Sequence, residues 1–125
     1  MTEKSTSYAP NTPFGRYIMR QLRRLFVYWP ERAAVRKRSF LRKEGVLSYH
    51  KCELCDKEVT RKESHVDHIV PVIPLTGPDD WGNIMERLFV SREAMQNLCK
   101  ECHAKKTKKE NSSRATNRKI RKTSV

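Results

Sequence analysis

Apolar residues recur at helical spacing near the start of the chain, with basic residues between them. From Phe14 to Tyr28 this spacing predicts an amphipathic helix with a basic face. Trp29-Pro30 ends that helix, because proline disrupts a helix interior. A second helix, rich in arginine and lysine, is predicted from Glu31 to about Lys43, with Gly45 at its end. The first half of the chain is therefore expected to be helical and cationic.

Shorter apolar segments follow and alternate with turn residues. They predict a strand or loop over 47–51, a strand over 65–72, a loop over 74–80 and a short strand within 92–98. A short helix is predicted from Trp81 to Phe89, with Ile84, Met85 and Leu88 facing inward, and another helix from Cys102 to about Glu110. Trp81 and Phe89 are expected in the core, with stacking on bases as the alternative. The expected organisation is a disordered N-terminus (1–13), a basic helical arm (14–45), a core (46–111) and a basic flexible tail (112–125).

Four cysteines add a constraint that the apolar pattern does not contain. Cys52 and Cys55 form one Cys-x-x-Cys pair, and Cys99 and Cys102 form a second. Four thiolates in a tetrahedron make a closed structural zinc site. The segment from Cys52 to Cys102 has 51 residues, too few for a large core, so zinc is expected to contribute to folding.

The disulfide alternative is disfavoured by the rest of the sequence. Residues 1–13 are polar and lack the apolar stretch of a signal peptide, and no apolar run approaches a membrane span. We therefore expect a reducing, cytoplasmic setting with no membrane association, where Cys-x-x-Cys pairs favour metal over disulfides.

Charge is distributed unevenly along the chain, whose net charge is +13. Residues 1–51 contain 12 basic and 3 acidic residues, residues 52–103 contain 6 and 10, and residues 104–125 contain 9 and 1. Two basic flanks around a slightly acidic centre suit a polyanion held on both sides of a site. The plainer alternative is a solvated basic surface. We expect nucleic-acid binding.

A second group of residues suggests chemistry beyond structural zinc. Asp67 is a hard oxygen ligand, and His103 follows Cys102 directly, so the second Cys pair would hold its imidazole rigidly. Together they would suit a divalent ion that keeps open positions for a phosphodiester. His68 adjoins Asp67, and side chains of adjacent strand residues point to opposite faces, although a bent strand edge would let both reach one phosphate. A neutral imidazole at that place suits a general base.

The chain resembles the HNH (His-Me finger, ββα-metal) endonucleases, and more narrowly their small zinc-stabilised phage and prophage members. The matching segments are 66–71, 86–89 and 95–107, within a region from about Cys52 to Asn111. The resemblance implies an α+β fold with a small ββα-metal core and a four-cysteine zinc site, here preceded by two basic helices. It also implies a phage-encoded, metal-dependent DNA endonuclease that nicks or fully cuts double-stranded DNA in the host cytoplasm.

The resemblance also assigns roles. It makes His68 the residue that activates water, and Asp67 and His103 the ligands of one catalytic ion such as Mg²⁺, Mn²⁺ or Ni²⁺. The middle asparagine of the family corresponds to Ala94 here, so the third protein ligand is unidentified. Asn97 is not expected to replace it. A partnership with a phage terminase in DNA packaging is a further implication, with homing as the other family setting.

Several neighbouring residues allow more than one interpretation. His65 shares a strand face with Asp67, and a structural or substrate-side role is favoured over metal ligation. Basic residues on the flanks are candidate DNA contacts, with a solvated face as the alternative for Lys106: Arg20, Arg23, Arg24, Arg36, Lys37, Arg38, Lys105, Lys106 and Lys109.

Two functions compete with the nuclease. One is a non-catalytic zinc-dependent DNA-binding module, which has no use for Asp67, His68 and His103 together. The other is an RNA-binding zinc protein, which a small basic chain fits equally well.

Overall fold

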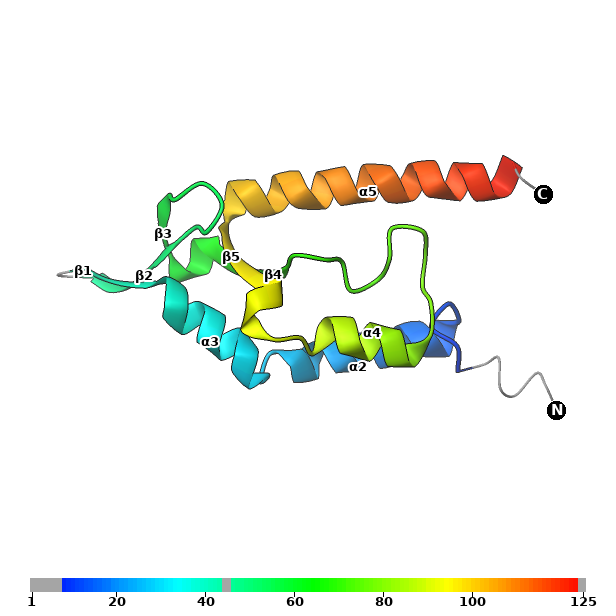
Figure 1. The fold of residues 1–125 in the computed structure, drawn as a ribbon, viewed down its shortest axis with the longest axis horizontal. Coiled ribbons are helices and arrows are strands. Elements are labelled where there is room, and N and C mark those ends of the chain that lie inside the picture. The colour runs from blue at the N-terminus through cyan, green and yellow to red at the C-terminus, as the bar shows by residue number, and fades with distance from the viewer. Residues whose placement is uncertain (1–7, 44–45, 124–125) are drawn as a thin grey trace.

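The structure is a computed structural model that describes residues 8–43 and 46–123. Its elements follow in the order α2 (Pro13–Phe26), α3 (Pro30–Ser39), β1 (Phe40–Lys43), β2 (Val46–Lys51), β3 (Glu58–Thr60), η1 (Arg61–Glu63), β4 (Ser64–His68), α4 (Trp81–Leu88), η2 (Arg92–Ala94), β5 (Met95–Cys99) and α5 (Lys100–Thr123). The long helix α5 runs along one side of the molecule, and α2 and α4 run along the other (Figure 1). The fold is α+β, as the sequence predicts.

Strands β4 and β5 and helix α5 form a ββα unit. The two strands are antiparallel, with Asp67 opposite Gln96 and His68 opposite Met95. Since α5 begins at Lys100, directly after β5, the end of this small sheet leads straight into the helix. One face of β4 therefore meets α5, and the other meets the helices from the first half of the chain.

The second predicted helix is shorter than expected. It ends at Ser39, and Phe40–Lys43 forms β1, which pairs with β2 in the antiparallel sheet β1-β2-β3. Pairing with β2 gives the backbone of this basic segment a strand conformation that its composition does not suggest. The expected helix end at Gly45 lies outside the described residues. The strand predicted over 65–72 likewise ends at His68.

The two helices of the predicted basic arm are part of the core. Phe26 and Val35 are buried with Ile84, Leu88 and Met95. Trp29 packs against this cluster, and its indole N–H donates to the Val90 carbonyl oxygen at 2.7 Å. Trp81 and Phe89 are partly buried against this cluster, in agreement with the predicted core role, whereas Met85, predicted to face inward, is 45% exposed because it lies on the outer face of α4. The helices are thus fixed on the ββα unit rather than extended from it.

The N-terminal segment is more ordered than predicted over its described part. Residues 1–7 lie outside the described residues, whereas residues 8–12 form a turn ahead of α2. The Thr12 side chain accepts a hydrogen bond from the Gly15 N–H and caps the helix. A Cβ at Gly15 would lie 2.0 Å from the carbonyl oxygen of Ala9, so glycine permits this close approach.

The C-terminal segment also differs from the prediction. Helix α5 does not end near Glu110 but continues to Thr123. Its second half is tied to the segment between β4 and α4, because Arg114 donates to the Ile73 carbonyl at 2.8 Å and Asn117 donates to that of Leu75 at 3.0 Å. In Figure 1 this segment lies between α5 and α4. None of the described helices is long and apolar enough to cross a membrane.

Candidate metal centre and active site

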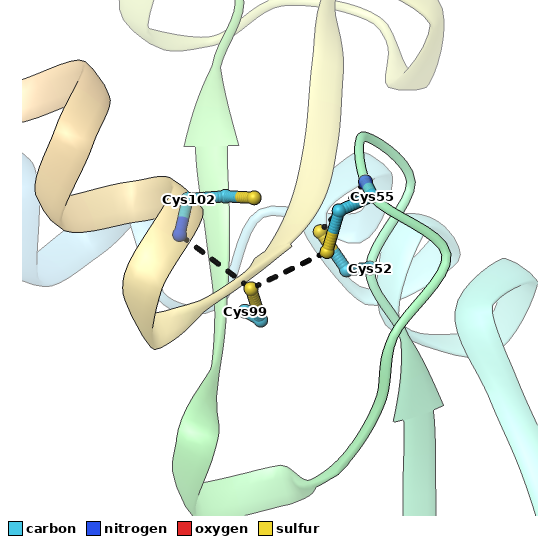
Figure 2. A group of neighbouring side chains, drawn as sticks. All are labelled: Cys52, Cys55, Cys99 and Cys102. Carbon is cyan, nitrogen blue, oxygen red and sulfur yellow. Dashed lines mark hydrogen bonds between the residues drawn. The ribbon is translucent and has the colours of Figure 1, made fainter.

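The four cysteines meet at one point. Cys52 and Cys55 come from the turn after β2, Cys99 ends β5, and Cys102 lies in the first turn of α5 (Figure 2). Their sulfur atoms all lie within 4.8 Å of one another, and Cys55 Sγ is 3.7 Å from Cys99 Sγ. Four sulfurs at about 2.3 Å from one Zn²⁺ would be about 3.8 Å apart. This cysteine cluster therefore fits zinc, and it offers no further ligand position.

Backbone amides point at the sulfurs, as thiolate ligands require. The N–H groups of Cys55 and Cys102 donate to the sulfurs of Cys52 and Cys99, each at 3.5 Å. Burial raises the pKa of the Cys52 thiol, but backbone donors, that of Cys55 foremost, outweigh it and lower this pKa to about 7. Burial and the neighbouring thiols raise the pKa of Cys102 to about 12. A bound cation would favour the thiolate form throughout the cluster.

A group of hydrogen bonds, which we call the Glu53 brace, joins the first cysteine pair to β5. The Glu53 carboxylate accepts from the Asn97 N–H at 2.7 Å and from two nitrogens of Arg38, each at 2.7 Å. Asn97 is fully buried, and its side chain donates to the Lys51 carbonyl at 3.1 Å. Asn97 therefore acts in the structure of the cysteine cluster, in agreement with the expectation that it is not the functional asparagine.

Arg38 also belongs to this brace, which bears on its suggested DNA contact. Besides Glu53, its guanidinium donates to the carbonyl oxygens of Arg92 and Met95, at 3.2 and 3.1 Å. Four hydrogen bonds within the protein use this side chain, which gives it a structural role. A contact between Arg38 and DNA stays a prediction, and it is less favoured because these hydrogen bonds already use the guanidinium.

Asp67 and His103 meet on the α5 face of β4. The Asp67 carboxylate oxygen Oδ1 lies 4.0 Å from Nε2 of His103. Two ligand atoms each about 2.1 Å from one ion are at most about 4.2 Å apart, so this pair fits a shared divalent cation. The other carboxylate oxygen, Oδ2, lies 3.0 Å from Nζ of Lys106 and accepts from Gln96 at 3.5 Å.

Lys106 binds three groups of the site at once. Its ammonium lies 3.0 Å from Asp67, 2.6 Å from Glu110 and 3.0 Å from the His68 carbonyl oxygen. Burial lowers the pKa of this lysine, but the two carboxylates outweigh burial and raise it. Lys106 is thus a permanent cation that fixes the Asp67 carboxylate and the end of β4. From the sequence, only a phosphate contact or a solvated face is expected for this residue.

His68 points to the opposite face of β4. Its Nε2 lies 2.8 Å from the Leu88 carbonyl oxygen, and its ring lies 4.7 Å from that of Phe26. Because a carbonyl can only accept, Nε2 carries the proton and Nδ1 holds the lone pair. Burial lowers the pKa of His68 most strongly, against the raising effects of Leu88 and Asp67, so the ring is neutral near pH 7.

A small cavity brings the two faces together at the end of β4. Its volume is about 140 Å³, and we name it the Asp67–His68 cavity; it is lined by Arg23, Asp67, His68, Pro71, Val72, Ile73, Lys106, Glu110 and Arg114. It joins residues from α2, β4, the segment after β4 and α5. A carboxylate and an imidazole therefore face one space together with several cations.

Three residues of this cavity are not assigned to the site by the sequence. Arg23 is predicted only as a DNA contact, Arg114 only as a charge of the tail, and Glu110 has no expected role. Arg114 and Glu110 lie on α5 with Lys106 at a spacing of four residues, which puts all three on one helix face. This spacing of four residues is the sequence feature from which Glu110 and Arg114 could have been placed beside Lys106.

His65 lies against His103 and away from the cavity. The two rings are stacked, with centroids 4.7 Å apart and planes 18° from parallel. Burial, followed by the nearby charges of His103, Arg36 and Lys100, lowers the pKa of His65. The contact suits a residue that holds the His103 ring in place. The structural or substrate-side role favoured for His65 over metal ligation stays a prediction.

The remaining predicted DNA contacts differ in their surroundings. Arg36 is half-buried and donates to the Ser64 hydroxyl. The others lie on α2, α3 and α5: Arg20, Arg23, Arg24, Lys37, Lys105 and Lys109. They stay predictions.

A comparison with protein-family models finds one match in the centre of the chain. The family model described as HNH endonuclease matches residues 52–86, which contain Cys52, Cys55, Asp67 and His68. Neither the curated proteins nor the solved structures contain a match to the chain. The match ends before β5, and the fold brings Cys99, Cys102 and His103 to the matched segment. The resemblance to HNH endonucleases is thus confirmed over residues 52–86, which supports a nucleic-acid-related function; the narrower resemblance to phage and prophage members and the segments beyond residue 86 stay predictions.

Proposed function

We propose that the protein is a metal-dependent HNH DNA endonuclease that hydrolyses a phosphodiester bond at the Asp67–His68 cavity. One observation carries this proposal: Asp67 lies 4.0 Å from His103 and also lines, with His68, a cavity that is open to a phosphate. A non-catalytic zinc module would need the cysteine cluster but not this second group.

His68 is the general base of the proposed reaction. The Leu88 carbonyl fixes Nε2–H, so Nδ1 is left to accept the proton of an attacking water. The oxygen of that water then bonds to phosphorus, and the bond from phosphorus to the departing sugar oxygen breaks. The burial that keeps His68 neutral also keeps it ready to take the proton.

Asp67 and His103 are the proposed ligands of the catalytic cation. Their 4.0 Å separation and their mixed oxygen and nitrogen donors fit Mg²⁺, Mn²⁺ or Ni²⁺ with open positions. A cation bound there would supply positive charge to the phosphate and to the departing oxygen. Lys106 and Gln96 orient the carboxylate, and His65 supports the imidazole.

Cationic groups of the cavity would hold the phosphate for attack. Arg23 and Arg114 approach it from α2 and α5. Arginine suits this task because its planar donors match phosphate oxygens. The cysteine cluster contributes rigidity, since zinc would fix the junction of β5 and α5 from which His103 projects.

A plasmid assay tests the proposal. Zinc-loaded protein is incubated with supercoiled double-stranded DNA and Mg²⁺, Mn²⁺ or Ni²⁺, with and without excess chelator. We expect relaxed or linear product only when one of these cations is present, and none from Asp67→Asn protein that keeps its zinc. Equal cleavage by Asp67→Asn and unaltered protein would contradict the proposed site.

The resemblance adds a setting to this proposal. In that setting the protein acts in the host cytoplasm as a phage-encoded partner of terminase in DNA packaging. Copurification of terminase with tagged protein from infected cells tests this part, and its absence from such preparations would count against it.

A further inference from the structure

A second cavity is lined by α3, the turn that precedes it, strands β1 and β2, and the start of η1. Its volume is about 470 Å³, within the range of ligand sites in proteins. We name it the arginine cavity after Arg32, Arg36 and Arg61, which line it with Lys37, Tyr28 and Phe40. No acidic residue lines it, although the central region of the chain is acidic overall. It is separate from the Asp67–His68 cavity, and the two share no lining residue.

The arginine side chains of this cavity are crowded and poorly compensated. Nη1 of Arg36 donates to the Ser64 hydroxyl, whereas its Nε is buried with no hydrogen-bond partner in the described structure. Burial lowers the pKa of Arg32 and of Arg36, and the charge of Arg61 lowers both further. Within residues 8–43 and 46–123, no ion pair is found for these three arginines.

A buried donor without an acceptor is costly, and cations that repel one another add to the cost. An anion in the cavity would accept a hydrogen bond from the unpaired donor and would offset the repulsion between the arginines.

Aromatic side chains border the same cavity. Tyr28 is 83% exposed and Phe40 is 46% exposed, and both belong to its lining. The Phe40 ring is held edge-on against His50, at 5.8 Å between centroids. A cationic hollow with accessible aromatic rings is the arrangement that binds unpaired nucleotides, because each base offers a flat face for stacking. Bases within a duplex are already stacked on their neighbours and do not offer that face.

We propose that the arginine cavity binds one unpaired nucleotide of the DNA substrate, with its phosphate on Arg32, Arg36 and Arg61 and its base on Tyr28 and Phe40. The inference rests on the proposed nuclease function and names a substrate class: DNA with a single-stranded overhang or flap beside the cut.

The cavity is near enough to the reaction site for this. Arg36 bonds to Ser64, which begins β4, and Asp67 is three residues further along that strand, about 10 Å away.

Binding to short DNA tests the proposal without cleavage. Fluorescence anisotropy compares the full zinc-loaded chain with a labelled single-stranded oligonucleotide and with a blunt duplex, without added Mg²⁺ or Mn²⁺. We expect Tyr28→Ala to weaken single-strand binding about 5-fold or more, as loss of one stacked base does. The double variant Arg32→Gln/Arg61→Gln should weaken it about 10-fold or more, with a smaller effect on the duplex.

Matched controls separate this site from general charge and from misfolding. Lys62→Gln removes an exposed charge beside Arg61 but outside the cavity, and Tyr17→Ala removes an exposed aromatic of α2 outside it. Zinc content and the thermal midpoint are measured for every variant.

The proposal is overturned if the cavity variants affect single strands no more than Lys62→Gln and Tyr17→Ala do. It is equally overturned if they weaken single strands and blunt duplex alike, which would make the cavity a contact for the duplex backbone. If single-strand binding depends on the cavity residues but the protein never cleaves DNA, the nuclease function is contradicted and not this site. If the protein cleaves DNA but its single-strand binding does not depend on the cavity residues, this site alone is contradicted.

Discussion

The cysteine cluster and the Asp67–His68 cavity are built in opposite ways. The cluster holds four identical side chains from two short turns, with all sulfur atoms within 4.8 Å of one another. The cavity combines carboxylates, an imidazole and cations from α2, β4, α5 and the segment after β4. Four thiolates would saturate one zinc ion, whereas the mixed lining of the cavity would leave room for a phosphate. Under the proposed function, stability and chemistry are thus divided between two regions of a small chain.

The largest effect is expected when one cysteine of the cluster is replaced. Cys99→Ser should lose zinc and unfold the sheet and the start of α5, because binding of structural zinc supplies on the order of 10 kcal/mol in small zinc domains. Elemental analysis and thermal unfolding measure both effects. Asp67→Asn is the control and should keep about one zinc per chain. A metal-free Cys99→Ser protein with an unchanged midpoint would show that the cluster is not structural.

A change at Lys106 tests the Asp67–His68 cavity without removing a ligand of the cysteine cluster. Lys106→Met removes the cation that orients Asp67 and binds the His68 carbonyl, so cleavage should fall about 10- to 100-fold, as for other groups that orient metal ligands. Lys108→Met is the matched control, since Lys108 is exposed on the same helix and is not among the candidate DNA contacts. Cleavage rates and zinc content are measured together. If both variants cut equally well, Lys106 has no positioning role.

Two truncations divide α5 into functional parts. Removal of residues 112–125 deletes Arg114 and Asn117, which tie the segment after β4 to the helix, so cleavage should fall about 10-fold or more. Removal of 118–125 keeps both interactions and should leave the cleavage rate on saturating DNA unchanged. Equal rates for the two truncated proteins would contradict the role of Arg114 and Asn117.

The shorter truncation should still affect DNA affinity. It removes Arg118, Lys119, Arg121 and Lys122, all basic. The slope of log affinity against log salt should become shallower by about 0.9 for each phosphate that the shortened protein no longer binds. Anisotropy with a blunt duplex over a range of salt concentrations measures that slope. An unchanged slope would show that the last turns of α5 do not bind DNA.

The sequence was most informative where function depends on local spacing. The cysteine pairs, the adjacent Asp67 and His68, and His103 after Cys102 are all recognisable as short motifs, and the fold brings them together as expected. The ββα unit was expected from the resemblance to the HNH endonucleases, and the strands predicted over 65–72 and within 92–98 correspond to β4 and β5.

Tertiary interactions account for what the sequence did not predict. Residues 111–123 contain asparagine, serine and threonine, which are weak helix formers and suggest a tail, but Arg114 and Asn117 bind the carbonyls of Ile73 and Leu75, far away in the sequence, and support the helix. Arg38 resembles a free surface cation in the sequence because its partner Glu53 lies 15 residues further on. Long-range partners of this kind leave no periodic pattern in a single sequence.

The rate of a single turnover by His68→Gln protein tests the central claim most directly. His65→Gln, which removes only support for the His103 ring, is the comparison and should slow cleavage less, and both proteins must contain about one zinc per chain. Cleavage of a labelled duplex with Mn²⁺ should be about 10² to 10⁴-fold slower for His68→Gln, because the general base is lost while the cysteine cluster is intact. Cleavage by His68→Gln at the rate of the unaltered protein would contradict the assignment of chemistry to the Asp67–His68 cavity.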